Sequence, residues 1–188
     1  MTFPSHDLDT APEASKPLLE VSQKAFGRLP GLHKVLAESP QAYEGYQLLH
    51  KLFTETDFDA DELTVVWQSI NVEHECHYCV PAHTGIAKNM KVSDDITDAL
   101  RNETPLPSDK LEALRRFTVQ MVRARGNVSD AQMQAFFDAG YGHRAVLDVI
   151  LGLAQKTMSN YINHVAETPV DKVFHPLKWE RGNTPLDV

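Results

Sequence analysis

Two cysteines and a histidine lie close together near the middle of this chain of 188 residues. Cys76 and Cys79 are its only cysteines, and His83 follows the second by four positions. Two thiols separated by two residues can close a reversible disulfide, and residues four apart share one face of a helix, so His83 can reach Cys79. An adjacent base favours the thiolate, the form of cysteine that attacks peroxides and disulfides and binds metals. This run of residues can therefore support redox or metal chemistry.

Three interpretations of the cysteine pair are open from its spacing. In the redox interpretation one thiol attacks, the other resolves, and a disulfide is the product. In the metal interpretation His74, His77 or His83 joins the thiolates in a zinc site. In the third, the cysteines are small buried residues without chemistry. Structural zinc normally takes two ligand pairs, and the chain has no second pair of that kind, so the redox interpretation is favoured.

A histidine base benefits from a carboxylate that orients it. Glu73 lies three residues before Cys76 and shares its helical face if the helix extends that far, so Glu73 is the candidate for this role. Glu75 is also close, whereas Glu62 is already explained as half of a helix cap. The alternative for Glu73 is that it lies at a solvated helix end and has no role in the site.

The segment from Asn160 to His164 is a polar cluster near the end of the last predicted helix. It follows an apolar run, so its side chains continue a helix that packs against the core. His164 could approach the thiols, or the cluster could form a buried or interface network of hydrogen bonds.

Pro81 fixes where the helix that carries His83 must begin. Proline has no amide donor and is tolerated in the first turn of a helix, where donors are unpaired. The helix therefore begins close to Cys79, at an N-terminus whose partial positive charge lowers the pKa of a thiol. The position of the proline predicts that Cys79 is the more acidic thiol.

Helical periodicity runs through nearly the whole chain, and no segment shows the period-two alternation of a strand. Capping residues, prolines and glycines divide the pattern into helices. The predicted helices cover about residues 15–26, 32–37, 39–53, 59–70, one from 79, one from 93, 108–125, 129–140 and 143–166. The fold class is all-α, a single-domain helical bundle over residues 11–172, with a flexible N-terminus (1–10) and an irregular C-terminal tail (173–188).

Composition narrows the possible partners. A formal charge of −8 argues against nucleic acid or an anionic membrane surface. No uninterrupted apolar stretch is long enough to span a membrane, and the N-terminus has no export pattern, so we expect a cytoplasmic protein. The arginines at 115, 116, 123 and 125 are interpreted as a solvated helix face.

The run from Cys76 to Thr84 resembles the Cys-x-x-Cys-x-x-x-His signature of alkylhydroperoxidase D-like proteins in the carboxymuconolactone decarboxylase superfamily. The segments 11–19 and 27–30 look like the N-terminal part of its peroxidase-related branch. The segments 123–130, 160–164 and 168–171 look like its C-terminal half. The resemblance covers about residues 11–172.

This resemblance implies an all-helical bundle of the alkylhydroperoxidase D-like type that assembles into dimers, trimers or hexamers and reduces peroxides without a cofactor. It assigns the peroxide-attacking role to Cys79, the resolving role to Cys76 and the proton relay to His83. The relay of the family usually includes a glutamate twelve residues before the first cysteine, where this chain has Thr64. Gln68, Asn71, Glu73 and Glu75 are the nearby candidates to replace it.

We therefore expect an antioxidant enzyme that reduces small alkyl hydroperoxides through a dithiol-disulfide cycle. An external dithiol, lipoyl or thioredoxin-like, is the expected reductant. The alternatives are a redox sensor or zinc-binding protein without turnover, and a carboxymuconolactone decarboxylase-type lyase, whose chemistry has no evident need for a dithiol.

Overall fold

Capping residues place the helix starts where the sequence predicts them. The computed structural model describes residues 3–182. Ser39 caps the helix that begins at Pro40, and Ser108 caps the one that begins at Asp109. The capping boxes that begin at Asp59 and Ser129 are both formed. Side-chain oxygens at these positions satisfy amide groups that the first turn leaves unpaired.

The described residues form an all-α structure in one domain, as predicted. The α-helices are α1 (Lys16–Phe26), α2 (Gly31–Leu36), α3 (Pro40–Thr54), α4 (Ala60–Glu73), α5 (Cys79–Asn89), α6 (Asp94–Asn102), α7 (Asp109–Ala124), α8 (Asp130–Asp138) and α9 (His143–Val165). Two short 3₁₀ helices, η1 (Glu13–Ser15) and η2 (Lys172–Leu177), lie near the two ends.

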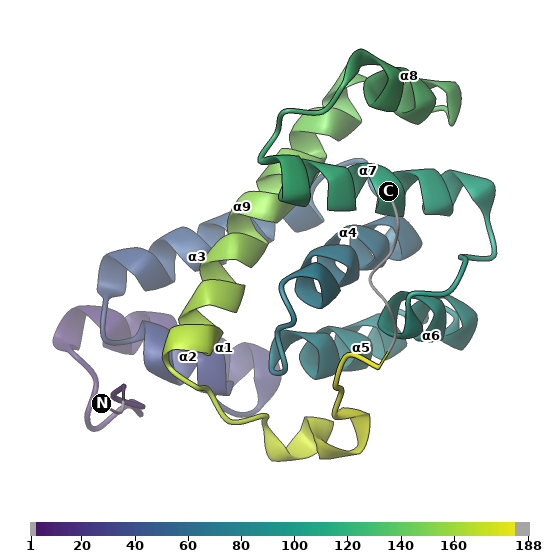
Figure 1. Cartoon of the computed structure of the whole chain (residues 1–188). Coiled ribbons are helices and arrows are strands. Elements are labelled where there is room, and N and C mark those ends of the chain that lie inside the picture. Colours follow the sequence, from purple (N-terminus) through teal and green to yellow (C-terminus); the bar gives the residue numbers. More distant parts are fainter. Residues whose placement is uncertain (1–2, 183–188) are drawn as a thin grey trace.

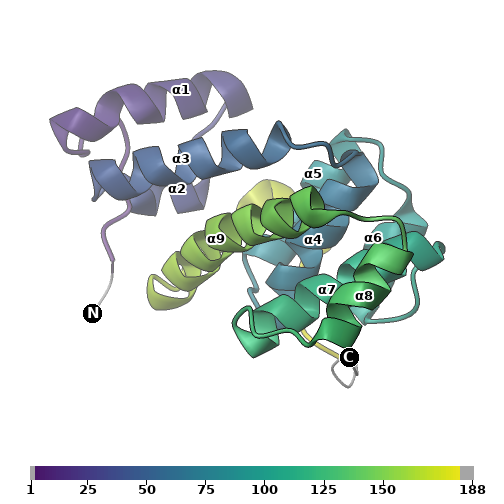
Figure 2. The same ribbon diagram turned by 90° about the horizontal axis from the view of Figure 1, so that it is seen from above.

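Helix α4 is the centre of the molecule. Every residue from Glu62 to Val72 is buried, which is the pattern of a helix covered on all sides. Helices α5, α6, α7 and α9 pack against it, and α3 runs along α9 on the outer side (Figure 1). Seen from above, α1, α2 and α3 lie together on one side of α9 (Figure 2).

The buried apolar side chains form two clusters. The larger one surrounds α4 and includes Phe53, Trp67 and Phe117. The smaller one lies between the α1–α3 layer and the rest of the molecule, and it contains Cys76 and Cys79. The dithiol therefore lies in an apolar environment where the N-terminal layer meets the α4–α5 turn.

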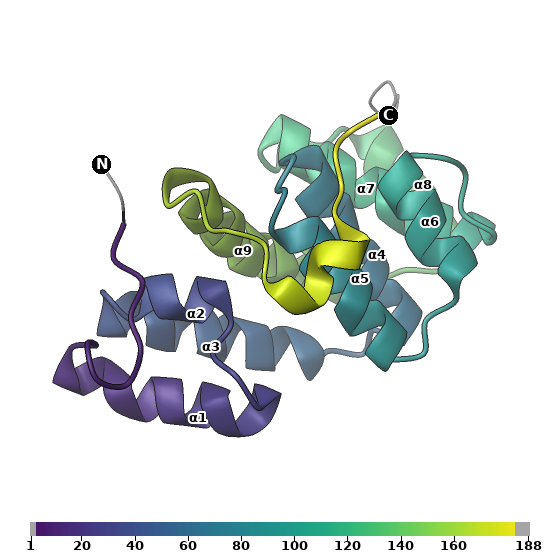
Figure 3. The same ribbon diagram turned by 90° about the horizontal axis from the view of Figure 1, so that it is seen from below.

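The segment after α9 lies against α5 and α6. Helix η2 packs on α5, as seen from below (Figure 3). The Trp179 indole N–H donates to the carbonyl of Arg101 at 2.8 Å, and Arg181 pairs with Glu103. Within residues 173–182 the chain thus contains a short helix and specific contacts, while the predicted tail beyond 182 lies outside the described residues.

No helix within the described range is both long and apolar enough to cross a membrane.

The interpretation of the arginine cluster as a solvated face is wrong for Arg115, which is only 3% exposed. Its guanidinium donates to the carbonyl of Thr104 at 2.7 Å and pairs with Glu112. Such partners are needed because a buried charge without them is costly.

Candidate functional site

The turn between α4 and α5 places the two thiols. Helix α4 ends at Glu73 with His74 as its C-cap, Glu75 adopts a left-handed conformation with φ 53°, and the amide of Cys76 donates back to the carbonyl of Asn71 at 2.9 Å. This is the hydrogen-bond pattern of a Schellman cap. It reverses the chain so that Cys76 immediately precedes α5, whose first residue is Cys79.

Both cysteines are free and buried, with Cys76 0% and Cys79 2% exposed. The amide N–H of Cys79 donates to Sγ of Cys76 at 3.3 Å, so the two residues are in direct contact. The prediction that the helix begins at Cys79 is confirmed. An N-terminal helix position and a neighbouring sulfur are both suited to reversible disulfide formation.

Helix α9 supplies hydrogen bonds to the second thiol. Nδ2 of Asn163 lies 3.2 Å from Sγ of Cys79 and donates to it. Burial raises the pKa of Cys79, but the hydrogen bond from Cys76, the ammonium of Lys156 and the hydrogen bonds from Asn163 and Asn160 outweigh burial. The pKa of Cys79 is therefore lowered, and Cys79 is the thiolate of the pair.

The same interactions act in the opposite direction on Cys76. Its hydrogen bond with Cys79 and its burial both raise the pKa of Cys76. A thiol that donates a hydrogen bond to a neighbouring thiolate stays protonated, because removing its proton would place two negative charges side by side. The geometry thus separates the pair into a thiolate at Cys79 and a thiol at Cys76.

Lys156 is the buried cation of the site. It projects from the middle of α9 and is 1% exposed, and its Nζ lies 2.9 Å from Nε2 of His83. Burial lowers the pKa of Lys156, whereas the charges of Cys79 and Cys76 raise it. An ammonium at this depth favours the thiolate form of Cys79, since each charge reduces the cost of burying the other.

His83 lies one helical turn after Cys79, with its ring against the indole of Trp67 at 4.9 Å between centroids. Burial and the charge of Lys156 lower the pKa of His83 well below its ordinary value. The imidazole is therefore neutral near pH 7. Its Nδ1 atom is buried and has no hydrogen-bond partner among the described residues.

A chain of amide side chains occupies the α4 face next to the thiols. Asn71 donates to Gln68 at 2.9 Å, and Asn160 of α9 donates to Asn71 at 3.0 Å. Gln68 in turn donates to the carbonyl of Val80 and to the hydroxyl of Thr84 on α5. Two of the residues named as replacements for a relay glutamate therefore lie beside the site, but they bring amides and no negative charge.

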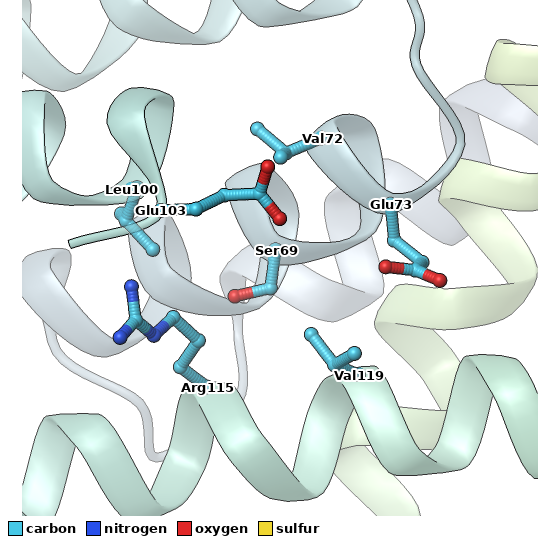
Figure 4. A pocket seen from close by; sticks show the side chains of 7 residues that line it. All are labelled: Ser69, Val72, Glu73, Leu100, Glu103, Arg115 and Val119. Carbon is cyan, nitrogen blue, oxygen red and sulfur yellow. The ribbon is translucent and has the colours of Figure 1, made fainter. Parts of the chain in front are cut away.

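The structure does not bring Glu73 to the dithiol. Its carboxylate accepts two hydrogen bonds from Arg123 at 2.7 and 2.9 Å and lies 3.7 Å from Arg181. Figure 4 shows Glu73 lining a small cavity with Ser69 and Arg115, where α4, α6 and α7 meet. Two arginines neutralise this carboxylate, and the helical twist directs it toward α7.

The other predicted carboxylates also have different partners. Glu75 accepts from Arg181 at 3.0 Å, and Glu62 combines its capping role with contacts to Lys110 and Tyr141. Thr64, twelve residues before Cys76, is buried in α4. None of these side chains is placed to hold the proton relay.

The remaining histidines near the motif are held elsewhere. His74 donates to Oδ1 of Asn160 at 3.0 Å, His77 donates to the carbonyl of Thr168 at 3.2 Å, and His164 is exposed. Across residues 3–182, no group of three or more His, Cys, Asp and Glu side chains is arranged to hold a metal ion. The zinc interpretation therefore has no third ligand in the described part of the chain.

Lys156 was not singled out from the sequence, whereas Asn163 lies in the polar cluster from Asn160 to His164, whose interpretation as a buried network of hydrogen bonds is confirmed for Asn160 and Asn163. Lys156 and Asn163 lie on the buried face of α9, with Gln155, Ser159 and Asn160. The signal was present, because the apolar stripe that begins near Val149 continues with polar residues at the same helical spacing. When the buried face of a helix changes from apolar to polar residues, the elements packed against it must offer polar groups to these residues.

Comparison with known proteins gives the fold. No family model matches the chain, and no curated protein matches it. An uncharacterized peroxidase-related protein from Ralstonia eutropha JMP134, described as an alkylhydroperoxidase AhpD core, superposes with a TM-score of 0.77 at 20% identity, covering 92% of this chain and 93% of that one. The chain has the AhpD-like fold.

Two further structures share this AhpD-like fold. An uncharacterized peroxidase-related protein from Silicibacter sp. TM1040 has a TM-score of 0.78 at 17% identity, with 93% of each chain covered. The debrominase Bmp8, in complex with 2,3,4-tribromopyrrole, has a TM-score of 0.72 at 13% identity, covering 94% of this chain and 95% of that one. Proteins with this fold thus include both peroxidase-related proteins and a debrominase.

Proposed function

We propose that this protein is a thiol-dependent peroxidase of the alkylhydroperoxidase D-like family that reduces small alkyl hydroperoxides. The observation that carries the proposal is the asymmetric dithiol, in which Cys79 receives hydrogen bonds and the charge of Lys156 while Cys76 remains protonated in contact with it. One thiolate that attacks and one thiol that resolves are the two groups that a dithiol peroxidase cycle uses.

The cycle has three steps. The thiolate of Cys79 attacks the terminal oxygen of the hydroperoxide, the O–O bond breaks, and the alkoxide leaves as an alcohol after taking a proton. The sulfenic acid of Cys79 then condenses with the thiol of Cys76, releasing water and forming the disulfide. An external dithiol reduces this disulfide by exchange and becomes oxidised itself.

The test is a peroxide-consumption assay with cumene hydroperoxide and dihydrolipoamide as the dithiol. Cys79→Ser is expected to abolish turnover, because the attacking sulfur is lost. Cys76→Ser is expected to retain one round of oxidation and to accumulate the sulfenic acid, which a dimedone probe detects by mass spectrometry. Consumption that continues unchanged in Cys79→Ser contradicts the proposal.

His83→Ala and Glu73→Gln separate the two predicted relay residues. His83→Ala is expected to slow peroxide reduction by about 100-fold, the range of a lost proton transfer. Glu73→Gln is expected to leave the rate within about twofold, because its carboxylate is paired with Arg123 away from the thiols. Equal losses in both variants would restore Glu73 to the relay.

The reductant, the assembly and the location also belong to this proposal. A lipoyl group or a thioredoxin-like protein is the proposed source of electrons, and the two are compared by replacing dihydrolipoamide with reduced thioredoxin in the assay. A homo-oligomer (dimer, trimer or hexamer) is proposed, with sedimentation velocity as its test. Cytoplasmic location and the absence of nucleic-acid and membrane partners remain predictions from the sequence.

Because the debrominase Bmp8 shares the fold, brominated pyrroles are a second substrate class to test. A brominated pyrrole belongs in the same assay, with bromide release as the readout. In that reaction the dithiol supplies two electrons, the carbon–bromine bond becomes a carbon–hydrogen bond, and bromide and the disulfide are the other products. Bromide release that exceeds peroxide reduction would assign the dithiol to reductive dehalogenation.

A further inference from the structure

Lys156 is a buried cation without a carboxylate partner. Its Nζ contacts Nε2 of His83 at 2.9 Å, and no ion pair with Asp or Glu is formed by Lys156 in the described part of the chain. Titratable groups from α3, from the end of α4 and from the α5 motif face Lys156. They are His50 of α3, His74 at the end of α4, and Cys76, Cys79 and His83 of the α5 motif. Tyr46 of α3 is a further titratable group close to Cys79.

Among these groups the thiolate of Cys79 is the counter-ion of Lys156. Burial lowers the pKa of His50, His74 and His83, so the three imidazoles are neutral near pH 7. Burial also keeps Tyr46 protonated by raising its pKa. The charge of Lys156 is therefore balanced only while Cys79 is reduced and ionised.

The contact between Lys156 and His83 sets the tautomer of the imidazole in the state in which Lys156 is an ammonium, the form that the charges of Cys79 and Cys76 favour. An ammonium has donors and no acceptor, so Nε2 of His83 accepts from Lys156 and the ring proton of the neutral imidazole is on Nδ1. That Nδ1–H is buried and meets no acceptor within the structure. A buried donor without a partner is rare, and here it lies one turn after the thiolate, where an oxygen of the substrate can accept from it.

We propose that Lys156 stores the proton required by the leaving oxygen of the peroxide and delivers it through His83 when Cys79 is oxidised. This inference rests on the peroxidase cycle proposed above. Nδ1 of His83 gives its proton to the departing alkoxide, while Nε2 takes one from the ammonium of Lys156. Lys156 acts through His83 and is a positioning residue.

The step balances without a proton from water. Thiolate, hydroperoxide and ammonium become sulfenic acid, alcohol and neutral amine, and the condensation with Cys76 then releases water. The negative charge of Cys79 and the positive charge of Lys156 disappear together, so the interior holds no unpaired charge in either redox state. Reduction of the disulfide restores both charges.

Proton counting tests this directly. The reduced protein is mixed with one equivalent of hydrogen peroxide in weakly buffered solution at neutral pH, and an indicator dye reports proton uptake. The wild type is expected to take up no proton from the solution for each dithiol oxidised, because Lys156 supplies the proton. Lys156→Arg keeps a positive charge but cannot give up its proton, so it is expected to take up one proton per dithiol and to react about 100-fold more slowly.

Two further variants make the result interpretable. Lys156→Met removes the charge, so the ultraviolet absorbance of the Cys79 thiolate at neutral pH is expected to vanish, whereas Lys156→Arg is expected to retain it. Lys88→Arg is the matched control, since Lys88 is an exposed lysine on α5. This replacement is expected to leave the rate and the proton count unchanged. Circular dichroism establishes that each variant is folded.

Repeating the proton count with diamide separates this inference from the proposed function. Diamide oxidises dithiols without a peroxide and also takes up two protons as it is reduced. If peroxide fails to oxidise the protein but diamide gives no proton uptake, the peroxidase proposal fails and the role of Lys156 stands. Uptake of one proton in the wild type with either oxidant overturns the role of Lys156.

Discussion

At the scale of single residues, the acidity of Cys79 depends on side chains that lie far away in the sequence. Asn163 is 84 positions later, yet its amide hydrogen bond is one of the interactions that lower the pKa of Cys79. Hydrogen bonds to a charged form stabilise it, so removing one raises the pKa. The thiol is activated by the fold as much as by the Cys-x-x-Cys motif.

We predict that the iodoacetamide reaction of Cys79 persists below neutral pH and decreases only in acid. The pKa of Cys79 is lowered, so the thiolate is present above that pKa and is lost as pH falls through it. Asn163→Ala is expected to move the midpoint upward by about one pH unit. Mass spectrometry of the labelled peptide gives the rate at each pH.

The control for this experiment is Asn127→Ala, since Asn127 is exposed and lies in the turn after α7. It is expected to leave the midpoint unchanged. A wild-type midpoint equal to that of the urea-unfolded protein would show that the fold does not activate Cys79.

His33 makes stability depend on pH. It is buried on α2, its Nδ1 contacts the hydroxyl of Ser22, and burial lowers its pKa to about 4. The unfolded chain binds a proton on this residue near pH 6.5, whereas the folded chain does not, so stability is full above pH 6.5 and decreases as pH falls toward 4. The maximal loss from this group is roughly 3 kcal/mol.

Urea denaturation at pH 7 and pH 5 measures this effect. His33→Gln is expected to reduce the difference in unfolding free energy between the two pH values, although its own stability at pH 7 is lower. An unchanged difference would assign the pH dependence to other groups, such as His50, whose pKa is also lowered to about 4.

At the scale of elements, Gly152 sets how closely α9 approaches its neighbours. A Cβ at this position would lie 2.7 Å from the ring of Phe53 on α3 and 2.9 Å from a methyl group of Val66 on α4. Both side chains are fully buried and cannot move away freely. Helix α9 can therefore bring Lys156 to the thiols only because residue 152 has no side chain.

Gly152→Ala is expected to lower the free energy of unfolding by about 2 kcal/mol, as is typical of an overpacked core. It is also expected to raise the pKa of Cys79, since α9 carries the groups that lower it. The matched control is Gly45→Ala in α3, where an added Cβ meets nothing within 4 Å. That change is expected to stabilise by roughly 0.5–1 kcal/mol through helix propensity, and a loss there would contradict the comparison.

The helices could be predicted because their signals are local. Ser39, Ser108 and the two capping boxes each lie within three residues of the amides they bind, so the pattern can be read from a short stretch. The start of α5 at Cys79 was predicted in the same way from Pro81. Capping residues and prolines, read over a few positions, therefore account for where the helices begin.

The environment of the thiols could not be predicted to the same extent. Glu73 is close to Cys76 in sequence, but the twist of α4 directs it to Arg123 on α7. Lys156 is distant in sequence, but the contact of α9 with α4 and α5 brings it to His83. Which residues meet across a helix interface depends on crossing geometry that no short segment encodes.

At the scale of the whole molecule, residues 168–182 connect the end of α9 to α5 and α6. Arg101 of α6 donates to the carbonyls of Leu177 and Lys178, and its own carbonyl accepts from Trp179. The ring of Phe174 lies against Gly85 of α5. This segment covers the outer side of the helix that carries Cys79 and His83.

We predict that deleting residues 173–188 lowers Tm by about 5–10 °C, since a lost contact of 1 kcal/mol costs about 2–4 °C in a protein of this size. Differential scanning calorimetry measures the change. Val173→Ser, which alters an exposed side chain only, is the control and is expected to leave Tm within about 1 °C. Equal Tm values for the deletion and the full chain would show that the segment adds no stability.

The position of Lys156, Asn160 and Asn163 on the last α-helix also has a consequence during protein synthesis. A ribosome completes Cys76, Cys79 and His83 long before it reaches α9. Until then the nascent chain carries two cysteines without the cation and amides that make one of them acidic. Reactivity toward oxidants is therefore acquired only after α9 has been synthesised, and a chain interrupted before α9 lacks the groups that lower the pKa of Cys79.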